Sequence, residues 1–218
     1  MENPSFTRGE YWILTAVAEH PVATFWLLHE RLEDALNRRG HGMQRPLFIL
    51  TMKKLISEGL VEIFHESAGV VPRDAAIERI EEYFPKDKPR YDDWYSYRLT
   101  PTGGHYWELF ASPCWDFYIT NRLSCPDNGS NIGFFELIGA HEKYIELCYQ
   151  SLVYHEWDVI EDSIQKSILK PWQATYWKEL PVGNKLTFRC RYKEDDSDFI
   201  VPEKNHMFRY KRIWCNWR

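Results

Sequence analysis

Hydrophobic residues recur at helical spacing three times within the first 60 residues of the chain. The first segment opens with Thr7 and Glu10 at capping-box spacing, so that each side chain can accept a hydrogen bond from the other residue's backbone N–H, and it stops before Pro21. The second segment, residues 24–40, begins with a threonine suited to cap a helix and ends at a glycine. The third, residues 46–59, begins with a proline and also ends at a glycine. The pattern therefore predicts three consecutive helices.

A strand-like alternation of apolar and polar residues follows. Residues 60–64 and 94–99 fit it, and a further helix start lies in residues 100–110. The insert between the two strands, residues 66–93, is longer than a usual hairpin loop, and Asp74 is placed to cap a short helix within it. We expect a two-stranded ribbon that carries a small folded insert, and then another helix.

The second half of the chain opens with turn-forming residues at 125–129. Apolar residues at helical spacing predict a long helix over residues 134–153 and a second helical stretch over residues 156–180, broken by a proline. Alternation predicts strands at residues 185–192 and 207–217, with an acidic turn between them. This half should combine helices with a small sheet.

Two stretches resemble a known family. The segments LISEGLVEIF (residues 55–64) and YSYRLTPTGGHYWE (residues 95–108) are similar to the end of the third helix, the two wing strands and the following helix of MarR-like and PadR-like winged-helix regulators. The resemblance covers residues 6–112. It implies a winged helix whose third helix enters the major groove of duplex DNA, as in a transcriptional regulator.

The expected fold class is therefore α+β. An N-terminal winged helix, residues 1–112, carries an enlarged wing at residues 66–93, and a mixed domain of helices and a small antiparallel sheet follows at residues 113–218. The resemblance does not extend into this second domain, and its role stays open.

The direction of each side chain on the third helix follows from one assumption. If Leu55 faces the core, helical spacing also buries Phe48, Met52 and Thr51 and turns Ile49 outward, toward the position of a DNA groove. Polar and basic side chains on or just before this helix are suited to contact bases and phosphates. These candidate DNA contacts are Arg38, Arg39, Gln44, Arg45, Lys53 and Lys54.

Charge changes this picture only locally. The chain carries a net charge of -5 with a pI near 5.9, which gives no global attraction for phosphate or for an anionic membrane. The first 110 residues contain 13 basic and 17 acidic residues, yet residues 35–55 contain five basic residues and no acidic one. No apolar run is long enough to span a membrane, and the N-terminus does not resemble a signal peptide, so we expect a cytoplasmic protein.

The motifs of common enzymes and metal sites do not occur. His141 and His155 are each followed by a glutamate but belong to no HExxH motif, and the Gly103–Gly104 pair lies at a helix start instead of in a phosphate-binding loop. The five cysteines include no CxxC pair and should be reduced and mostly buried: Cys114, Cys125, Cys148, Cys190 and Cys215. We expect no catalytic residues, no metal and no cofactor.

Aromatic residues leave two interpretations open. Ten tryptophans are enough for both a core and an exposed contact surface. The final run RYKRIWCNWR, residues 209–218, interleaves cations with aromatic rings, as surfaces for single-stranded nucleic acid do, but an edge strand guarded by cations fits equally and is the commoner case.

Two functions follow. The first is a winged-helix protein that binds duplex DNA and uses its C-terminal domain for dimerisation, sensing or partner binding, which leaves a homodimer open. The alternative is an interaction module, such as an immunity or assembly protein, that keeps the winged-helix shape for a protein partner. The apolar Ile49 and Leu50 on the third helix and the acidic insert favour this alternative, because apolar side chains read base edges poorly.

Overall fold

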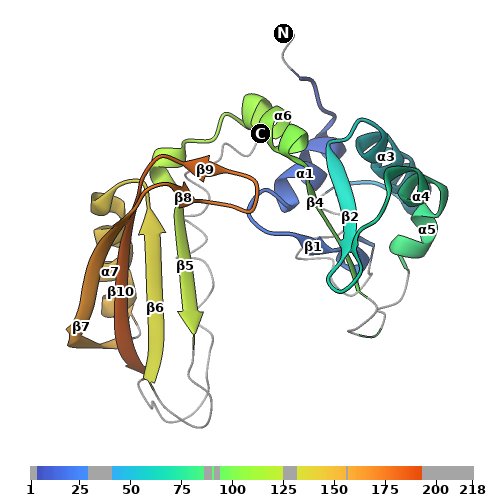
Figure 1. Ribbon diagram of the computed structural model, residues 1–218. Helices are drawn as coiled ribbons and strands as arrows, with labels where there is room; N and C mark the ends of the chain where they lie inside the picture. Colours follow the sequence, from blue (N-terminus) through green and yellow to red (C-terminus); the bar gives the residue numbers. More distant parts are fainter. Residues whose placement is uncertain are drawn as a thin grey trace. The chain divides into compact units, whose positions relative to one another are not determined.

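The protein is an α+β chain of two compact units (Figure 1). The computed structural model describes residues 4–28, 41–85, 90, 94–124, 132–155 and 157–192. Unit 1 consists of Met1–Phe110 together with Thr175–Trp177, and unit 2 consists of Ala111–Ala174 and Lys178–Arg218.

Unit 1 contains helices and short strands in alternation. In chain order they are α1 (Arg8–Ala16), β1 (Val22–Ala23), the 3-10 helix η1 (Thr24–Leu27), α3 (Arg45–Ser57), β2 (Val61–His65), β3 (Gly69–Val70), α4 (Arg73–Glu78), α5 (Ile80–Tyr83), β4 (Tyr95–Leu99) and α6 (Pro101–Ala111).

The first predicted helix is confirmed, including its cap. The Thr7 backbone N–H donates to Glu10 Oε2 at 2.7 Å, and the Glu10 backbone N–H donates to Thr7 Oγ1 at 3.3 Å, which completes the capping box of α1. The second predicted helix has a different start. Thr24 is the first residue of η1 and its hydroxyl donates to the Tyr95 carbonyl at 3.1 Å, so it ties η1 to β4 instead of capping a helix. Most of the rest of that predicted helix, residues 29–40, lies outside the described residues.

The third predicted helix and the ribbon after it are also confirmed. Gly59, at φ +70°, follows the end of α3, and its N–H donates to the Ile56 carbonyl at 2.9 Å. This left-handed conformation is one that glycine adopts at little cost, and it turns the chain directly into β2. β2 and β4 pair antiparallel, with Ile63 opposite Tyr97, in a sheet of order β1-β4-β2-β3. The Tyr97 hydroxyl donates to the Ile13 carbonyl at 3.1 Å and fixes this sheet on α1.

The insert between β2 and β4 folds as a small element, as predicted. β3 extends the ribbon, and α4 and α5 pack against α3, where the Phe84 ring lies 5.3 Å from the Phe48 ring. Asp74 does not cap α4, because the helix begins at Arg73 and its cap residue is Pro72, whose side chain makes no capping hydrogen bond.

Three residues from far along the chain complete unit 1. The Tyr176 hydroxyl donates to the Val17 carbonyl and accepts from the Leu99 backbone N–H, both at 2.7 Å. Trp177 Nε1 donates to the Ala18 carbonyl at 2.8 Å. A Cβ atom on Gly104 would lie 2.2 Å from the Trp177 ring, so this glycine makes room for the tryptophan.

Unit 2 is built on a four-stranded antiparallel sheet of order β5-β6-β10-β7. Its elements are the 3-10 helix η4 (Trp115–Phe117), β5 (Ile119–Ser124), β6 (Ile132–Gly139), α7 (Glu142–His155), β7 (Trp157–Leu169), β8 (Trp172–Gln173), β9 (Glu179–Leu180) and β10 (Gly183–Tyr192). α7 covers one face of the sheet (Figure 1). The core between them is formed by Phe135, Leu137, Ile145, Cys148, Leu152, Leu186, Phe188 and Cys190.

Of the two helix predictions in this half, the first is wrong in part and the second is wrong. Residues 134–139 belong to the strand β6, and only α7 keeps the predicted helical conformation. Residues 156–180 contain the strands β7, β8 and β9 where a helical stretch was expected, whereas the predicted strand at residues 185–192 is confirmed within β10. The predicted closing strand at residues 207–217 lies outside the described residues.

Candidate functional site

The surface of α3 is the candidate site, and its buried face is wider than the sequence indicated. Phe48, Met52 and Leu55 are fully buried, as predicted. Ile49 was expected on the outer face but is only 7% exposed, because α4 and α5 pack against α3 and enlarge its buried side. Thr51, expected inside, is half-buried.

Residues of the insert also bind Arg45, the first basic residue of α3. Arg45 Nη1 donates to the Phe84 carbonyl at 2.8 Å, and Nη2 lies 3.9 Å from a carboxylate oxygen of Glu81. Both partners belong to the insert between β2 and β4. The Arg45 guanidinium therefore links α3 to the insert.

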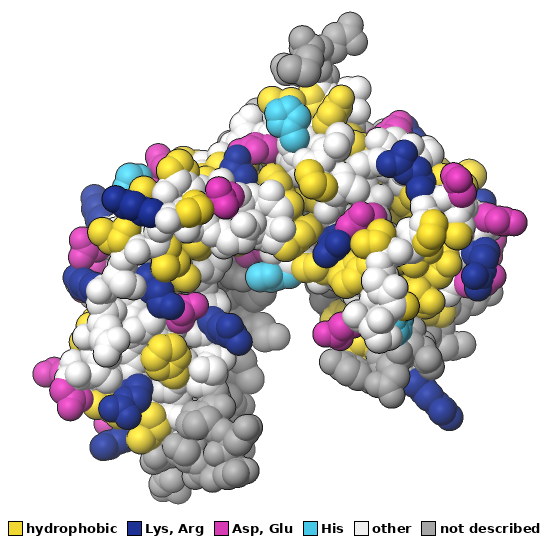
Figure 2. Space-filling view, viewed as in Figure 1, with side chains coloured by type: hydrophobic (Ala, Val, Ile, Leu, Met, Phe, Trp, Pro, Cys, Tyr) yellow, Lys and Arg dark blue, Asp and Glu magenta, His cyan; other side chains and the backbone are white. Residues whose placement is uncertain are grey.

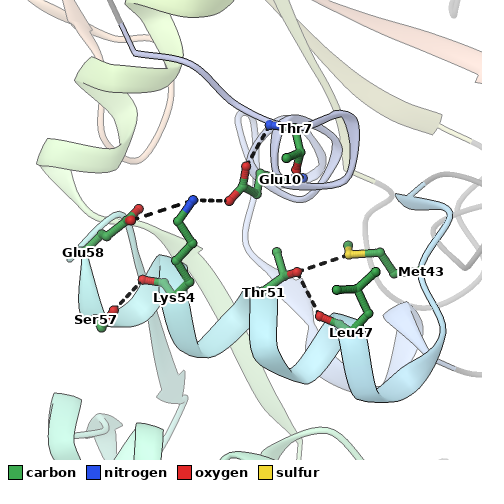
Figure 3. Close-up of polar contacts among 8 residues, drawn as sticks. All are labelled: Thr7, Glu10, Met43, Leu47, Thr51, Lys54, Ser57 and Glu58. Atoms are coloured by element: carbon green, nitrogen blue, oxygen red, sulfur yellow. Dashed lines mark hydrogen bonds and ion pairs between the residues drawn. The ribbon is translucent and has the colours of Figure 1, made fainter. Parts of the chain in front are cut away.

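The second cation, Lys54, is held from two sides (Figure 3). Its Nζ donates to Glu10 Oε1 at 2.5 Å and lies 3.8 Å from a Glu58 carboxylate oxygen. Burial by itself would raise the pKa of Glu10, but hydrogen bonds from Lys54 and Thr7 outweigh it and hold that pKa below its ordinary value. The same hydrogen bond raises the pKa of Lys54.

The other predicted contacts divide into two groups. Gln44 is exposed at the N-terminal cap of α3 and its side chain makes no capping hydrogen bond, and Lys53 is half-buried near the other end of the helix. Neither side chain forms an ion pair with another described residue. Arg38 and Arg39 lie outside the described residues.

The outermost side chains of α3 are apolar. Leu47 is 55% exposed and Leu50 is 64% exposed, three residues apart and therefore on one face, with the exposed Pro46 beside them. We call Pro46, Leu47 and Leu50 the apolar ridge. The sequence interpretation named Leu50 as a poor reader of bases but missed Leu47, although the helical spacing of the two residues was visible.

Next to the ridge, the Thr51 side chain contacts the Leu47 backbone and Met43 (Figure 3). The Thr51 hydroxyl donates to the Leu47 carbonyl at 2.9 Å and contacts the Met43 sulfur at 3.3 Å. α3 thus presents the apolar ridge together with two cations, Arg45 and Lys54, that are ion-paired within unit 1.

The described part of unit 2 contains no clustered metal ligands. Among the described residues, no three His, Cys, Asp or Glu side chains come together as a metal site. His141 lies 3.4 Å from a carboxylate oxygen of the exposed Asp116, and the neighbouring Glu142 instead binds Lys166 at 2.7 Å, so the two residues of this pair diverge as expected.

The described cysteines are free thiols, as predicted. Cys148 of α7 and Cys190 of β10 are buried in the core of unit 2, and Cys114 is exposed. Burial raises the pKa of Cys148 to about 11, which keeps the thiol protonated and unreactive. Cys125 and Cys215 lie outside the described residues, as does the aromatic run at residues 209–218.

An open pocket between α7 and the strands β7 and β10 is lined by Glu142, Glu146, Lys166 and Ile168 among others. Its charged groups are largely committed, because Lys166 already pairs with Glu142, and this pairing lowers the pKa of the carboxylate. The lining also contains Asn184, whose amide donates to the Ala140 carbonyl, and Lys185, which pairs with Glu136, so most of its donors are already engaged.

No described helix has the length and apolar character needed to cross a membrane. Comparison of the chain with protein-family models, with curated protein sequences and with solved structures finds no match, so the function has to be argued from the surface of α3 itself.

Proposed function

We propose that the chain is a protein-interaction module whose unit 1 has a winged-helix arrangement and contacts its partner through the apolar ridge of α3. The order of elements supports the winged-helix part of this proposal. Helix α1, strand β1, helix α3 and the β2–β4 ribbon follow one another, and β4 lies between β1 and β2 in the sheet.

A single observation carries the choice of partner. On α3 the cations Arg45 and Lys54 are paired within unit 1, whereas the two outermost leucines of the ridge are more than half exposed. A helix that reads DNA presents hydrogen-bonding groups to base edges and free cations to phosphates. A rigid helix that presents apolar side chains at this spacing fits an apolar groove of another protein.

The insert indicates the chemistry around that groove. Two exposed carboxylates, Asp74 and Glu78, lie on α4, one of the helices packed against α3. Like charges across an interface disfavour binding, and complementary charges speed association. The partner we propose is therefore a protein with an apolar groove and a basic rim.

Affinity capture with full-length variants tests this proposal. Leu50→Asp places a charge on the ridge, and Leu147→Asp, on the exposed side of α7, is the matched control. After nuclease treatment of a native lysate, we expect at least one stoichiometric protein to be retained by wild type and by Leu147→Asp and to be reduced about tenfold or more by Leu50→Asp, because a buried unpaired charge costs several kcal/mol. Equal retention by both variants would exclude the ridge as the contact.

Duplex DNA binding is the second candidate, and it rests on Gln44 and Lys53. These are the predicted DNA contacts on α3 that form no ion pair with a described residue. A DNA-binding α3 requires Lys53 to contact phosphate, so the charge reversal Lys53→Glu separates the two candidates.

A further inference from the structure

The sheet of unit 2 has one face covered by α7 and one opposite face whose composition the sequence interpretation did not consider. Residues directly opposite each other on antiparallel strands point to the same side. Phe135 and Phe188 are such a pair and lie in the core under α7, so the neighbouring pair Phe134 and Arg189 points to the opposite side. We call the side chains of Arg122, Phe134, Glu136, Lys185, Arg189 and Arg191 the open face, since the strand register places them on one side. Ile138 and Thr187 point to the same side and are buried.

An exposed aromatic ring stands within this face. Phe134 is 42% exposed on β6, an inner strand of the sheet, with Arg189 of β10 opposite it on one side and Ser124 of β5 on the other. A phenylalanine in the middle of a sheet is usually covered, and an exposed one offers a flat surface for stacking.

The charges around the ring are predominantly positive. Arg122, Arg189 and Arg191 are exposed, and none of them forms an ion pair with another described residue. Glu136, which lies opposite Arg122, is neutralised by its ion pair with Lys185. Asp158 lies opposite Arg191, and the exposed Glu161 and Asp162 belong to the irregular stretch of β7 next to Arg189. Figure 2 shows basic and hydrophobic side chains intermingled over this sheet.

We propose that the open face binds single-stranded nucleic acid, with a base stacked on Phe134 and phosphates bound by Arg122 and Arg189. Neighbouring strands lie about 4.8 Å apart, so these two arginines, on β5 and β10, stand on the order of 10 Å apart on either side of β6. Cations on both sides of an exposed ring follow the backbone of an unpaired strand while its base stacks. A duplex keeps its bases stacked inside and cannot use the ring.

The proposal is independent of the function assigned to α3, because it concerns unit 2 alone. Fluorescence anisotropy of full-length protein tests it with labelled oligo-uridine and oligo-thymidine of about 12 nucleotides and with a duplex of equal length, at about 50 mM salt. We expect both single strands to bind at least about tenfold more tightly than the duplex, and the two arms to show whether the 2′-hydroxyl contributes.

Variants with matched controls locate the binding. Phe134→Ala should weaken binding about tenfold or more by removing the stacking surface, and Arg189→Glu should weaken it similarly and lower the salt slope by about 0.7 or more. Leu147→Ala and Lys143→Glu, on exposed positions of α7, should change affinity less than about twofold, and circular dichroism checks that each variant is folded. Absence of single-strand binding, preference for the duplex, or equal losses in the control variants would overturn the proposal.

Discussion

At the residue scale, the best-defined polar interaction in unit 1 joins Glu10 of α1 to Lys54 of α3. Glu10 is only 4% exposed, and its carboxylate accepts from Lys54 and from the Thr7 backbone. A buried carboxylate without a cation is costly, so Lys54 serves the fold before it can serve any partner.

Lys54→Met keeps the aliphatic part of this side chain and removes the charge. Because the pKa of Glu10 is lowered in the folded state, its contribution to stability is present above the ordinary carboxyl pKa and is lost as pH falls through the lowered value. We expect Lys54→Met to reduce the free energy of unfolding by about 1–2 kcal/mol at pH 7 and by much less near pH 3, in urea titrations. Lys53→Met, on the same helix, should change it by less than about 0.5 kcal/mol at either pH. A Lys54→Met effect that is equal at both pH values would contradict this role.

Single residues also show what the sequence could and could not reveal about the site. Gly59 was predicted correctly, because a positive φ after a helix is a local requirement. The hydrogen-bond partners of Arg45 and Lys54, Phe84 and Glu10, are 39 and 44 positions away in the chain, so no local pattern could show them. Only the ion pair of Lys54 with Glu58, four residues later, was visible as a local spacing.

At the element scale, the same contrast separates the two halves of the chain. Capping boxes, terminal glycines and short alternating strands are local signals, and unit 1 follows them at α1, at α3 and in the β2–β4 pair. In unit 2 the isoleucines at 160, 164 and 168 recur every four residues, as in a helix, but they lie in the strand β7. A register shift in the pairing of β7 with β10 changes the face to which the strand's side chains point. A spacing of four residues therefore does not predict a helix in this segment.

The insert between β2 and β4 determines which side chains of α3 stay exposed. Its helices α4 and α5 were expected as a small separate element, yet they also bury Ile49 and bind Arg45. A simple hairpin at this position would leave both residues free. The apolar ridge is what remains exposed after this packing.

At the scale of the whole molecule, unit 1 is not one continuous stretch of sequence. The sequence predicted a single domain boundary, between residues 112 and 113. In the structure, residues 175–177 also belong to unit 1. Tyr176 and Trp177 donate hydrogen bonds to the backbone carbonyls of Val17 and Ala18, which follow α1. Carbonyls at the end of a helix need such partners from outside the helix.

Removing the Tyr176 hydroxyl tests whether residues 175–177 stabilise unit 1. Tyr176→Phe leaves the Leu99 N–H and the Val17 carbonyl without their partner, which should destabilise unit 1 by about 1–3 kcal/mol and speed hydrogen exchange at the Leu99 amide by about tenfold. Tyr106→Phe, on the exposed side of α6, is the matched control and should leave that exchange rate unchanged. Unchanged exchange in Tyr176→Phe would show that residues 175–177 contribute little to unit 1.

The central claim, that α3 meets a protein and not DNA, is tested most directly by titrating a labelled DNA duplex with wild type and Lys53→Glu over a range of salt concentrations. If α3 does not contact DNA, reversing the charge of its uncommitted lysine leaves the affinity within about twofold and the salt slope unchanged. A fall in affinity of about tenfold, with a salt slope reduced by about 0.9 or more, would place α3 on the DNA backbone and contradict the account.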